Sequence, residues 1–178
     1  MPDLVPFDEI AHLFTDFEHT AWRLETRRGY ASDREGERFK AFMRGVMPAP
    51  EPEHSWNVNV RTQTAKGKRF SRVRIIDEPP TDGQRFLVAT AQGNAAAGED
   101  IRVLPRSEAK RLELPDHDLW LFDSRTLIRF HIDDTDTTTG VEVVEDSAEV
   151  LAACQARDAA WHFAVPTADA STQVRSSV

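Results

Sequence analysis

The chain has 178 residues and a formal charge of −8, with a sequence pI of about 5.2. This length fits one ordinary domain, and the negative charge disfavours indiscriminate attraction to nucleic acid or to anionic membranes. Cys154 is the only cysteine, so an internal disulfide is excluded. The start of the chain lacks a basic, apolar leader and no apolar run approaches ~20 residues, so cytoplasmic residence is expected.

A helical repeat opens the chain. Apolar residues recur at intervals of three and four, at Phe7, Ile10, Phe14 and Phe17. This spacing predicts a helix over about residues 7–20. The period then changes to two from Trp22 to Thr26, which predicts a half-buried strand, with a helix continuing to Arg27 as the competing interpretation.

A capping pattern follows at Ser32-Asp33-Arg34-Glu35, in which the serine and glutamate side chains would satisfy free backbone amides. It predicts a second helix that ends at Gly45, shortly before Pro48. From Trp56 the residues alternate again, and the stretches 56–62 and 70–76 predict a hairpin with its turn at 65–68.

The middle of the chain predicts further strands and a loop. Residues 85–90 are expected to form a strand, 92–100 a loop that could include one helical turn, and 101–104 a short strand. The apolar runs at 119–122 and 127–132 predict a second, central hairpin.

The C-terminal part predicts a strand at 141–144, then a helix that opens at Asp146 or Ser147, and a fraying tail over 167–178. Hairpins with helices at both ends predict an α+β fold with a mainly antiparallel sheet and helices packed on one face. We therefore expect a single α+β domain over residues 1–166 and a flexible tail over 167–178.

No catalytic signature is present. The sequence has no G-x-S-x-G elbow, no H-E-x-x-H and no glycine-rich phosphate loop, so neither a cofactor nor a metal site is predicted and a non-enzymatic role is favoured. Cys154 lies on the apolar face of a predicted helix, where an inert thiol is expected. The acidic loop 133–140 partly matches a calcium-binding loop, but Thr139 replaces the required glycine, which favours a polar hairpin loop.

Three acids near predicted strands form the one candidate for metal-assisted chemistry. Glu99 and Asp100 follow a small-residue loop, and Asp123 ends an apolar strand. Gathered together they could hold Mg²⁺ for phosphodiester chemistry. The favoured alternative is that they cap turns and pair with Arg102 or Arg106.

A basic segment lies between Glu53 and Asp77, where the chain has no acid and six positive charges, on Arg61, Lys66, Lys68, Arg69, Arg72 and Arg74. On a predicted hairpin these side chains could dock a phosphate backbone or an acidic protein surface. The favoured interpretation is that they pair with the chain's own acids.

Four phrases of the sequence carry a family resemblance. They are Arg23-Leu24-Glu25-Thr26 with Tyr30 beyond it, Gly67 followed by Arg72-Val73-Arg74, the run from Ala97 to Arg102 with Leu104-Pro105-Arg106, and Leu119-Trp120-Leu121-Phe122-Asp123. With these phrases the chain resembles the actinobacterial domain of unknown function 6879 family over almost its whole length. The resemblance implies a companion of helix-turn-helix regulators, in an arrangement like a toxin–antitoxin pair.

Two functional hypotheses follow. The first is a non-enzymatic accessory or regulatory protein that binds a protein partner, plausibly a helix-turn-helix regulator, through Lys66, Lys68, Arg69, Arg72, Arg74, Arg102 and Arg106. The second is a toxin-like, metal-dependent nuclease or phosphodiesterase that uses the acidic cluster. What would separate them is whether a candidate pocket brings together Glu25, Tyr30, Arg72, Arg74, Glu99, Asp100 and Asp123.

Overall fold

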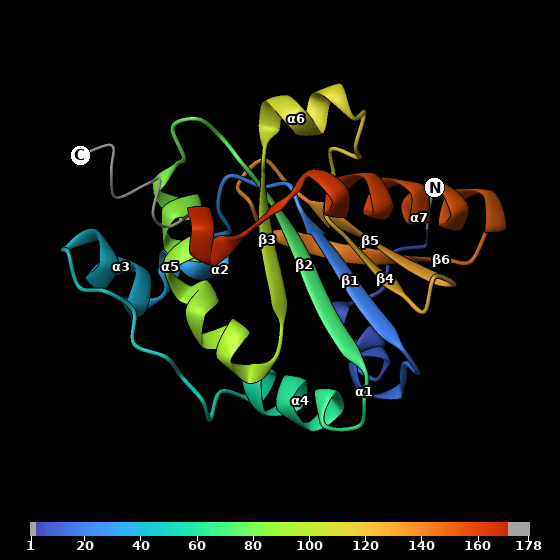
Figure 1. The fold of residues 1–178 in the computed structure, drawn as a ribbon, viewed down its shortest axis with the longest axis horizontal. Coiled ribbons are helices and arrows are strands. Elements are labelled where there is room, and N and C mark those ends of the chain that lie inside the picture. The colour runs from blue at the N-terminus through green and yellow to red at the C-terminus, as the bar shows by residue number, and fades with distance from the viewer. Residues whose placement is uncertain (1–2, 171–178) are drawn as a thin grey trace.

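A computed structural model describes residues 3–170, and in this range seven strands form one sheet in the order β6-β5-β4-β1-β2-β3-β7 (Figure 1). The strands are β1 (Thr20–Glu25), β2 (Arg69–Ile76), β3 (Asp100–Pro105), β4 (Leu119–Phe122), β5 (Thr126–Ile132), β6 (Thr138–Val144) and β7 (Val165–Pro166). The helices are η1 (Phe7–Ile10), α1 (Leu13–Asp16), α2 (Ala31–Glu35), α3 (Glu37–Met43), α4 (Ser55–Thr64), α5 (Asp82–Ala97), α6 (Arg106–Arg111) and α7 (Ser147–Phe163).

The sheet is mixed. The three strands β1, β2 and β3 run parallel, while β4, β5, β6 and β7 pair antiparallel with their neighbours. The expected mixture of helices and strands is confirmed, but the expectation of a mainly antiparallel sheet is wrong. Helical segments connect β1 to β2 and β2 to β3, and a crossover of this kind returns the chain parallel to its start.

The predicted hairpin at 56–76 is the first of two errors behind that difference. Its first arm is helix α4, and only its second arm is a strand, β2. The buried residues of α4 are Asn57, Val60 and Gln63, which are spaced by three as on one helix face, whereas Val58 is exposed. The alternation of apolar residues from Trp56 to Thr62 therefore does not follow burial.

The second error is at 85–90, where a strand was expected and helix α5 runs from Asp82 to Ala97. A capping box starts this helix, because Thr81 Oγ1 accepts a hydrogen bond from the Gln84 amide and Gln84 Oε1 accepts one from the Thr81 amide. The box predicted at Ser32 is not formed: the N-cap of helix α2 is Tyr30, two residues earlier, and its side chain makes no capping bond.

Other elements agree with the sequence patterns. The strand β1, the hairpin of β4 and β5, the strands β3 and β6, and the helix α7 with its N-cap Asp146 are all present. The predicted helix over 7–20 is divided into η1 and α1 and ends before β1. Loop 133–137 is a polar hairpin loop, in which Asp133 accepts hydrogen bonds from the amides of Thr135 and Thr137.

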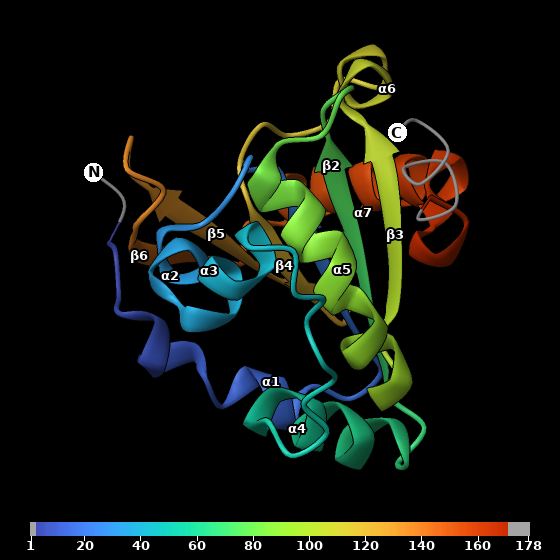
Figure 2. The ribbon, with the colours of Figure 1, turned by 90° about the vertical axis from the view of Figure 1, so that its left-hand side faces the viewer.

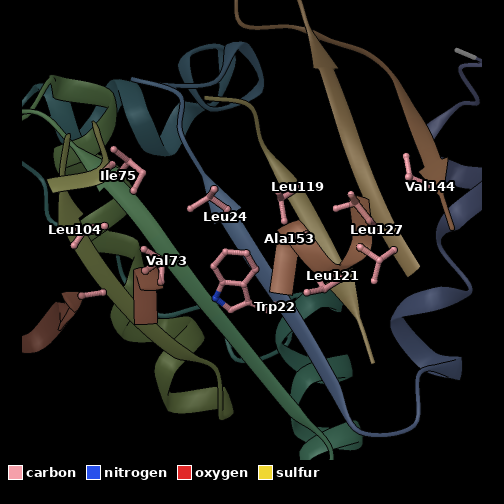
Figure 3. Close-up of a cluster of buried hydrophobic side chains, with 14 residues drawn as sticks. Trp22, Leu24, Val73, Ile75, Leu104, Leu119, Leu121, Leu127, Val144 and Ala153 are labelled. Atoms are coloured by element: carbon pink, nitrogen blue, oxygen red, sulfur yellow. The ribbon is translucent and has the colours of Figure 1, made fainter. Parts of the chain in front are cut away.

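Helices cover both faces of the sheet, which corrects the expectation of one covered face. On one face, α7 packs on Trp22, Leu24 and Val73 (Figure 3). On the other, aromatic residues of β2 and β4 pack against α1 and α4. Figure 2 shows α5 and α7 on opposite sides of β2 and β3. The alternating side chains of each central strand therefore enter two separate cores.

The end of the described chain packs on β3. Thr167 is buried and its hydroxyl donates a hydrogen bond to the Ile101 carbonyl, and Ala170 is also buried. Packing thus continues past residue 166, and the rest of the predicted tail, 171–178, lies outside the described residues. In the range 3–170, no helix has the length and apolar character needed to cross a membrane.

Candidate ligand-binding cavity

One face of the central strands changes character along its length. Ala21 on β1 and Phe70 on β2 begin this face inside the aromatic core. Two and four residues later come Arg23 and Glu25 on β1 and the paired Arg72 and Arg74 on β2. Because residues two apart share a face, the carboxyl-terminal half of this face carries charge in the interior of the protein.

Glu25 holds two arginines of the neighbouring strand. Its Oε1 accepts a hydrogen bond from Arg72 Nη1 at 2.6 Å, and its Oε2 accepts one from Arg74 Nε at 2.5 Å. Arg74 also donates to the carbonyl of Leu87 on α5. The side chains of Glu25 and Arg74 are 6% and 5% exposed, so these contacts form in a region from which water is largely excluded.

Glu99 extends the network at the start of β3. Its Oε1 accepts from Arg72 Nε at 2.6 Å, and its Oε2 accepts from Trp56 Nε1 at 3.0 Å. The guanidinium carbon of Arg72 also lies 5.6 Å from the centroid of the Trp120 ring. Arg72 is therefore held in place by two carboxylates and aromatic rings.

Asp118 forms the third acidic anchor, just before β4. Its Oδ2 accepts from Arg23 Nη2 at 2.8 Å and from the Tyr30 hydroxyl at 2.6 Å. Its Oδ1 accepts from the backbone amide and the hydroxyl of Thr26. Because β4 runs antiparallel to β1, the amino end of β4 lies beside the carboxyl end of β1. This pairing brings Asp118 close to Arg23.

Burial and neighbouring charges together shift the pKa values of three groups in this network. Burial would raise the pKa of Glu25, but the positive charges of Arg72, Arg74 and Arg23 outweigh it and hold the pKa well below 4.5. Burial would lower the pKa of Arg72, but Glu25 and Glu99 outweigh it and raise it. Burial, together with the charges of Glu25 and Asp118, raises the pKa of Tyr30, whose hydroxyl stays protonated and donates.

A cavity of about 860 Å³ lies above this charged floor. Arg23, Glu25, Arg72, Arg74 and Trp120 line it from the sheet. Its walls come from α2, α3, α5 and the segment 48–57. The strand β1 forms part of this floor and has parallel β2 on one side and antiparallel β4 on the other.

The floor has donors to spare and few free acceptors. Each oxygen of Glu25, Glu99 and Asp118 already accepts at least one hydrogen bond. A guanidinium has five N–H donors, and within residues 3–170 Nη2 of Arg72 and Nη2 of Arg74 have no hydrogen-bond partner. The floor therefore favours a ligand group that accepts hydrogen bonds.

Five of the seven residues named for one candidate pocket come together in this network. They are Glu25, Tyr30, Arg72, Arg74 and Glu99. Asp100 does not join them, because its side chain is 55% exposed and lies 3.6 Å from Arg102. Asp123 does not either, because it accepts hydrogen bonds from the amides of residues 18–20.

The proposed acidic cluster is thus dispersed, and Glu99, Asp100 and Asp123 do not form one metal site. Among the described residues, no three His, Cys, Asp or Glu side chains lie close enough together to hold a metal ion.

The basic residues named for partner binding occupy several places. Arg72 and Arg74 lie in the interior, whereas Lys66, in the turn before β2, and Arg69, the first residue of β2, are exposed. Lys68 donates to the Thr15 carbonyl and lies over the Phe17 ring. The seven residues therefore do not form one surface.

The two remaining basic residues lie on other contacts. Arg102 stacks 3.8 Å from the Trp161 ring centroid. Arg106 bonds Asp77 and the carbonyl of Thr26. As was favoured from the sequence, much of this basic set pairs with the chain's own groups.

Sequence reasoning missed Arg23, Trp56 and Asp118 as site residues, and also Asp33, which lines the cavity from α2. Arg23 was read as the polar face of a half-buried strand, but that face points at a cavity. The available signal was the position of Asp118 directly before an apolar strand, where an acid needs a partner inside the protein. Nothing in the sequence linked Trp56 to Glu99, because their contact depends on the packing of α4.

The chain is thus a mixed-sheet protein with a buried ionic floor beneath a cavity. The model of the family described as "Domain of unknown function (DUF6879)" matches residues 8–170, and the chain belongs to that family. The solved structure of NucT from Helicobacter pylori is similar in fold, with a TM-score of 0.52 and 9% sequence identity over 93% of this chain and 97% of that chain. No curated protein sequence matches the chain.

Proposed function

We propose that this chain is an accessory protein that binds a small, oxygen-rich molecule in the central cavity. The observation that carries the proposal is the set of unpaired donors on the floor: Arg72 and Arg74 keep N–H groups without a partner among residues 3–170, while each carboxylate oxygen of Glu25 and Glu99 already accepts a hydrogen bond. Carboxylate and phosphate oxygens are the acceptors that guanidinium groups hold best. Preorganised donors also reduce the ordering cost of binding.

The floor carries little net charge, which bears on selectivity. Its three arginines, Arg23, Arg72 and Arg74, are balanced by the carboxylates of Glu25, Glu99 and Asp118. Long-range attraction to any anion is therefore weak, and affinity depends on hydrogen-bond geometry inside the cavity. This arrangement favours one shaped ligand over anions in general.

The proposal is tested by thermal unfolding of the full chain with a panel of carboxylates and nucleoside monophosphates. A ligand at about 100 times its Kd should raise the midpoint by roughly 5–10 °C in a protein of this size. The matched variant is Ala89→Phe, since Ala89 lines the cavity from α5 and a larger side chain there would occupy it. This variant should lose the shift.

The control is Ala96→Phe, the same change at an exposed position of the same helix that does not line the cavity. It should keep the shift. A panel without any stabilising compound, or an Ala89→Phe variant that responds as the wild type does, would overturn the proposal.

Our second proposal is that the protein binds a helix-turn-helix regulator. The proposed binding surface is apolar and does not include the basic residues named from the sequence. Met43, Val46 and Met47 are 49%, 57% and 59% exposed and directly precede the segment 48–50 that lines the cavity. Exposed apolar side chains close together mark interaction sites, and flexible methionines suit them.

Replacing both Val46 and Met47 by Asp should abolish co-purification with a purified regulator from the same genome. Leu151→Asp, at a residue of α7 that is 58% exposed, is the control and should leave it intact. Equal retention by both variants would reject this surface.

A further inference from the structure

One carboxylate of the cavity, that of Asp33, has no partner among residues 3–170. Asp33 lies in the first turn of α2, which forms part of the cavity wall. Within the described part of the chain its side chain makes no hydrogen bond and no ion pair. It differs in this respect from the acids of the floor, Glu25, Glu99 and Asp118, which are all paired.

The cations around Asp33 are bound to other groups. Arg34 pairs with Asp136 at 2.8 Å and donates to the Thr135 carbonyl. Arg38 pairs with Glu51 and donates to the Ala49 carbonyl. Because both arginines bind other groups, the Asp33 carboxylate remains available at the cavity wall to accept a hydrogen bond from a ligand.

The surroundings of Asp33 penalise its charge. Burial, and after it the negative charge of Glu25, raise the pKa of Asp33 above its usual value. The positive charges of Arg74, Arg34 and Arg38 oppose this shift but are smaller effects. Arg74 itself is bound to Glu25 and to the Leu87 carbonyl. A positively charged or N–H donating group beside Asp33 would relieve this penalty. The wall is therefore complementary to a donor, whereas the floor is complementary to an acceptor.

Aromatic rings line the same cavity as these two polar regions. Phe39 of α3 and Phe86 of α5 meet edge to face, with their ring centroids 5.3 Å apart. Trp56 and Trp120 lie near the floor, 5.7 Å apart. All four line the cavity, and flat apolar walls favour a ligand with a ring.

We propose that the ligand of the central cavity is amphoteric, with a carboxylate or phosphate group toward Arg72 and Arg74, a ring between the aromatic walls, and an amino group toward Asp33. This inference rests on the proposed function and adds to it the amino group and the residue that recognises it. Asp33 makes no intramolecular bond through its side chain in the described structure, so its substitution should not disturb the fold.

The test uses pairs of compounds that differ only in the amino group. The carboxylate pair is L-phenylalanine and 3-phenylpropionate, and the phosphate pair is adenosine 5′-monophosphate and purine riboside 5′-monophosphate. Isothermal titration of the full chain should show binding in at least one pair, with the amino compound at least about tenfold tighter, as expected for a hydrogen bond to a charged group. The pair that binds identifies the oxyanion.

In Asp33→Asn the preference for the amino compound should fall to less than about a third of its wild-type value, while the affinity of the partner without the amine stays unchanged. Glu35→Gln, at an exposed acid on the same helix that does not line the cavity, is the control and should keep the preference.

The outcomes separate the two proposals. If both members of a pair bind equally, or Asp33→Asn keeps the full preference, the amphoteric ligand is rejected while the oxygen-rich ligand stands. The same holds if the wider panel yields only ligands without an amino group. If neither these pairs nor the wider panel of oxyanions bind, both proposals fall.

Discussion

Replacing Glu25 by Gln removes one charge from the buried network without changing the size of the side chain. Three arginines then face two carboxylates, and Arg74 loses its carboxylate partner and keeps the Leu87 carbonyl. Breaking a buried ion pair from one side typically costs about 3–5 kcal/mol. A domain has only about 5–15 kcal/mol of total stability, so the variant should fold and be markedly weakened.

The measurement is urea unfolding followed by circular dichroism, with the free energy of unfolding obtained by linear extrapolation. Glu37→Gln is the control, because Glu37 pairs with Lys40 on an exposed helix surface and should not change the free energy measurably. The double variant Glu25→Gln, Arg74→Met restores charge balance and should recover part of the loss. A loss below about 1 kcal/mol in Glu25→Gln, or a double variant no more stable than it, would refute the reasoning.

The pH dependence of the same variant follows from the depressed pKa of Glu25. A carboxylate with a lower pKa in the folded state than in the unfolded one stabilises the fold fully above the unfolded value, here 4.5. That stabilisation is lost as the pH falls below 4.5 toward the folded value. The wild type should therefore lose more stability than Glu25→Gln between about pH 5 and pH 3. Parallel pH profiles for the two proteins would contradict the assignment.

Two further substitutions probe the framework of the site. Gly83→Ala should lower the free energy of unfolding by about 2–3 kcal/mol, because its Cβ would lie 2.6 Å from the Arg28 carbonyl oxygen and 2.8 Å from Gly29 Cα. The control is Gly93→Ala on the same helix, whose Cβ would meet only an ordinary contact at 3.5 Å. This control should be neutral or stabilising. Equal midpoints in urea would contradict this. Asp123→Asn keeps a residue type that tolerates the positive φ of 51° at this position. It weakens the hydrogen bonds from the backbone amides of residues 18–20, and should lower the free energy of unfolding by about 1 kcal/mol at neutral pH. An unchanged free energy of unfolding would show that these hydrogen bonds do not stabilise the fold.

The two helices missed in the sequence show where pattern reasoning fails. In α4, apolar residues alternate from Trp56 to Val60 although only one helix face is buried. In α5, the run Phe86-Leu87-Val88 has strand propensity, while the capping box of Thr81 and Gln84 just before it predicts a helix. The hydrophobic period alone does not distinguish a helix from a strand in a short apolar segment. In α5 the capping residues were the more reliable indication of the secondary structure.

The candidate site divides in the same way. The sequence indicated Glu25, Tyr30, Arg72, Arg74 and Glu99 as members of a candidate pocket, because all five lie in or beside the segments that resemble the family. It could not show that Asp118 would meet Arg23, since that contact needs β4 to lie antiparallel beside β1. Nor could it show that Asp33 would remain unpaired, because this depends on Arg34 and Arg38 turning to other partners.

The sequence by itself determined the local features of this protein: the alternating pattern of β1, the apolar run of β4, the N-cap of α7 at Asp146, and the charged residues within β1 and β2. Only the tertiary structure decided that β1, β2 and β3 lie parallel, that helices cover both faces, and that the charged face looks into a cavity. The physical reason is range. Period and capping act over a few neighbouring residues, whereas strand order and the pairing of buried charges depend on contacts between segments tens of residues apart.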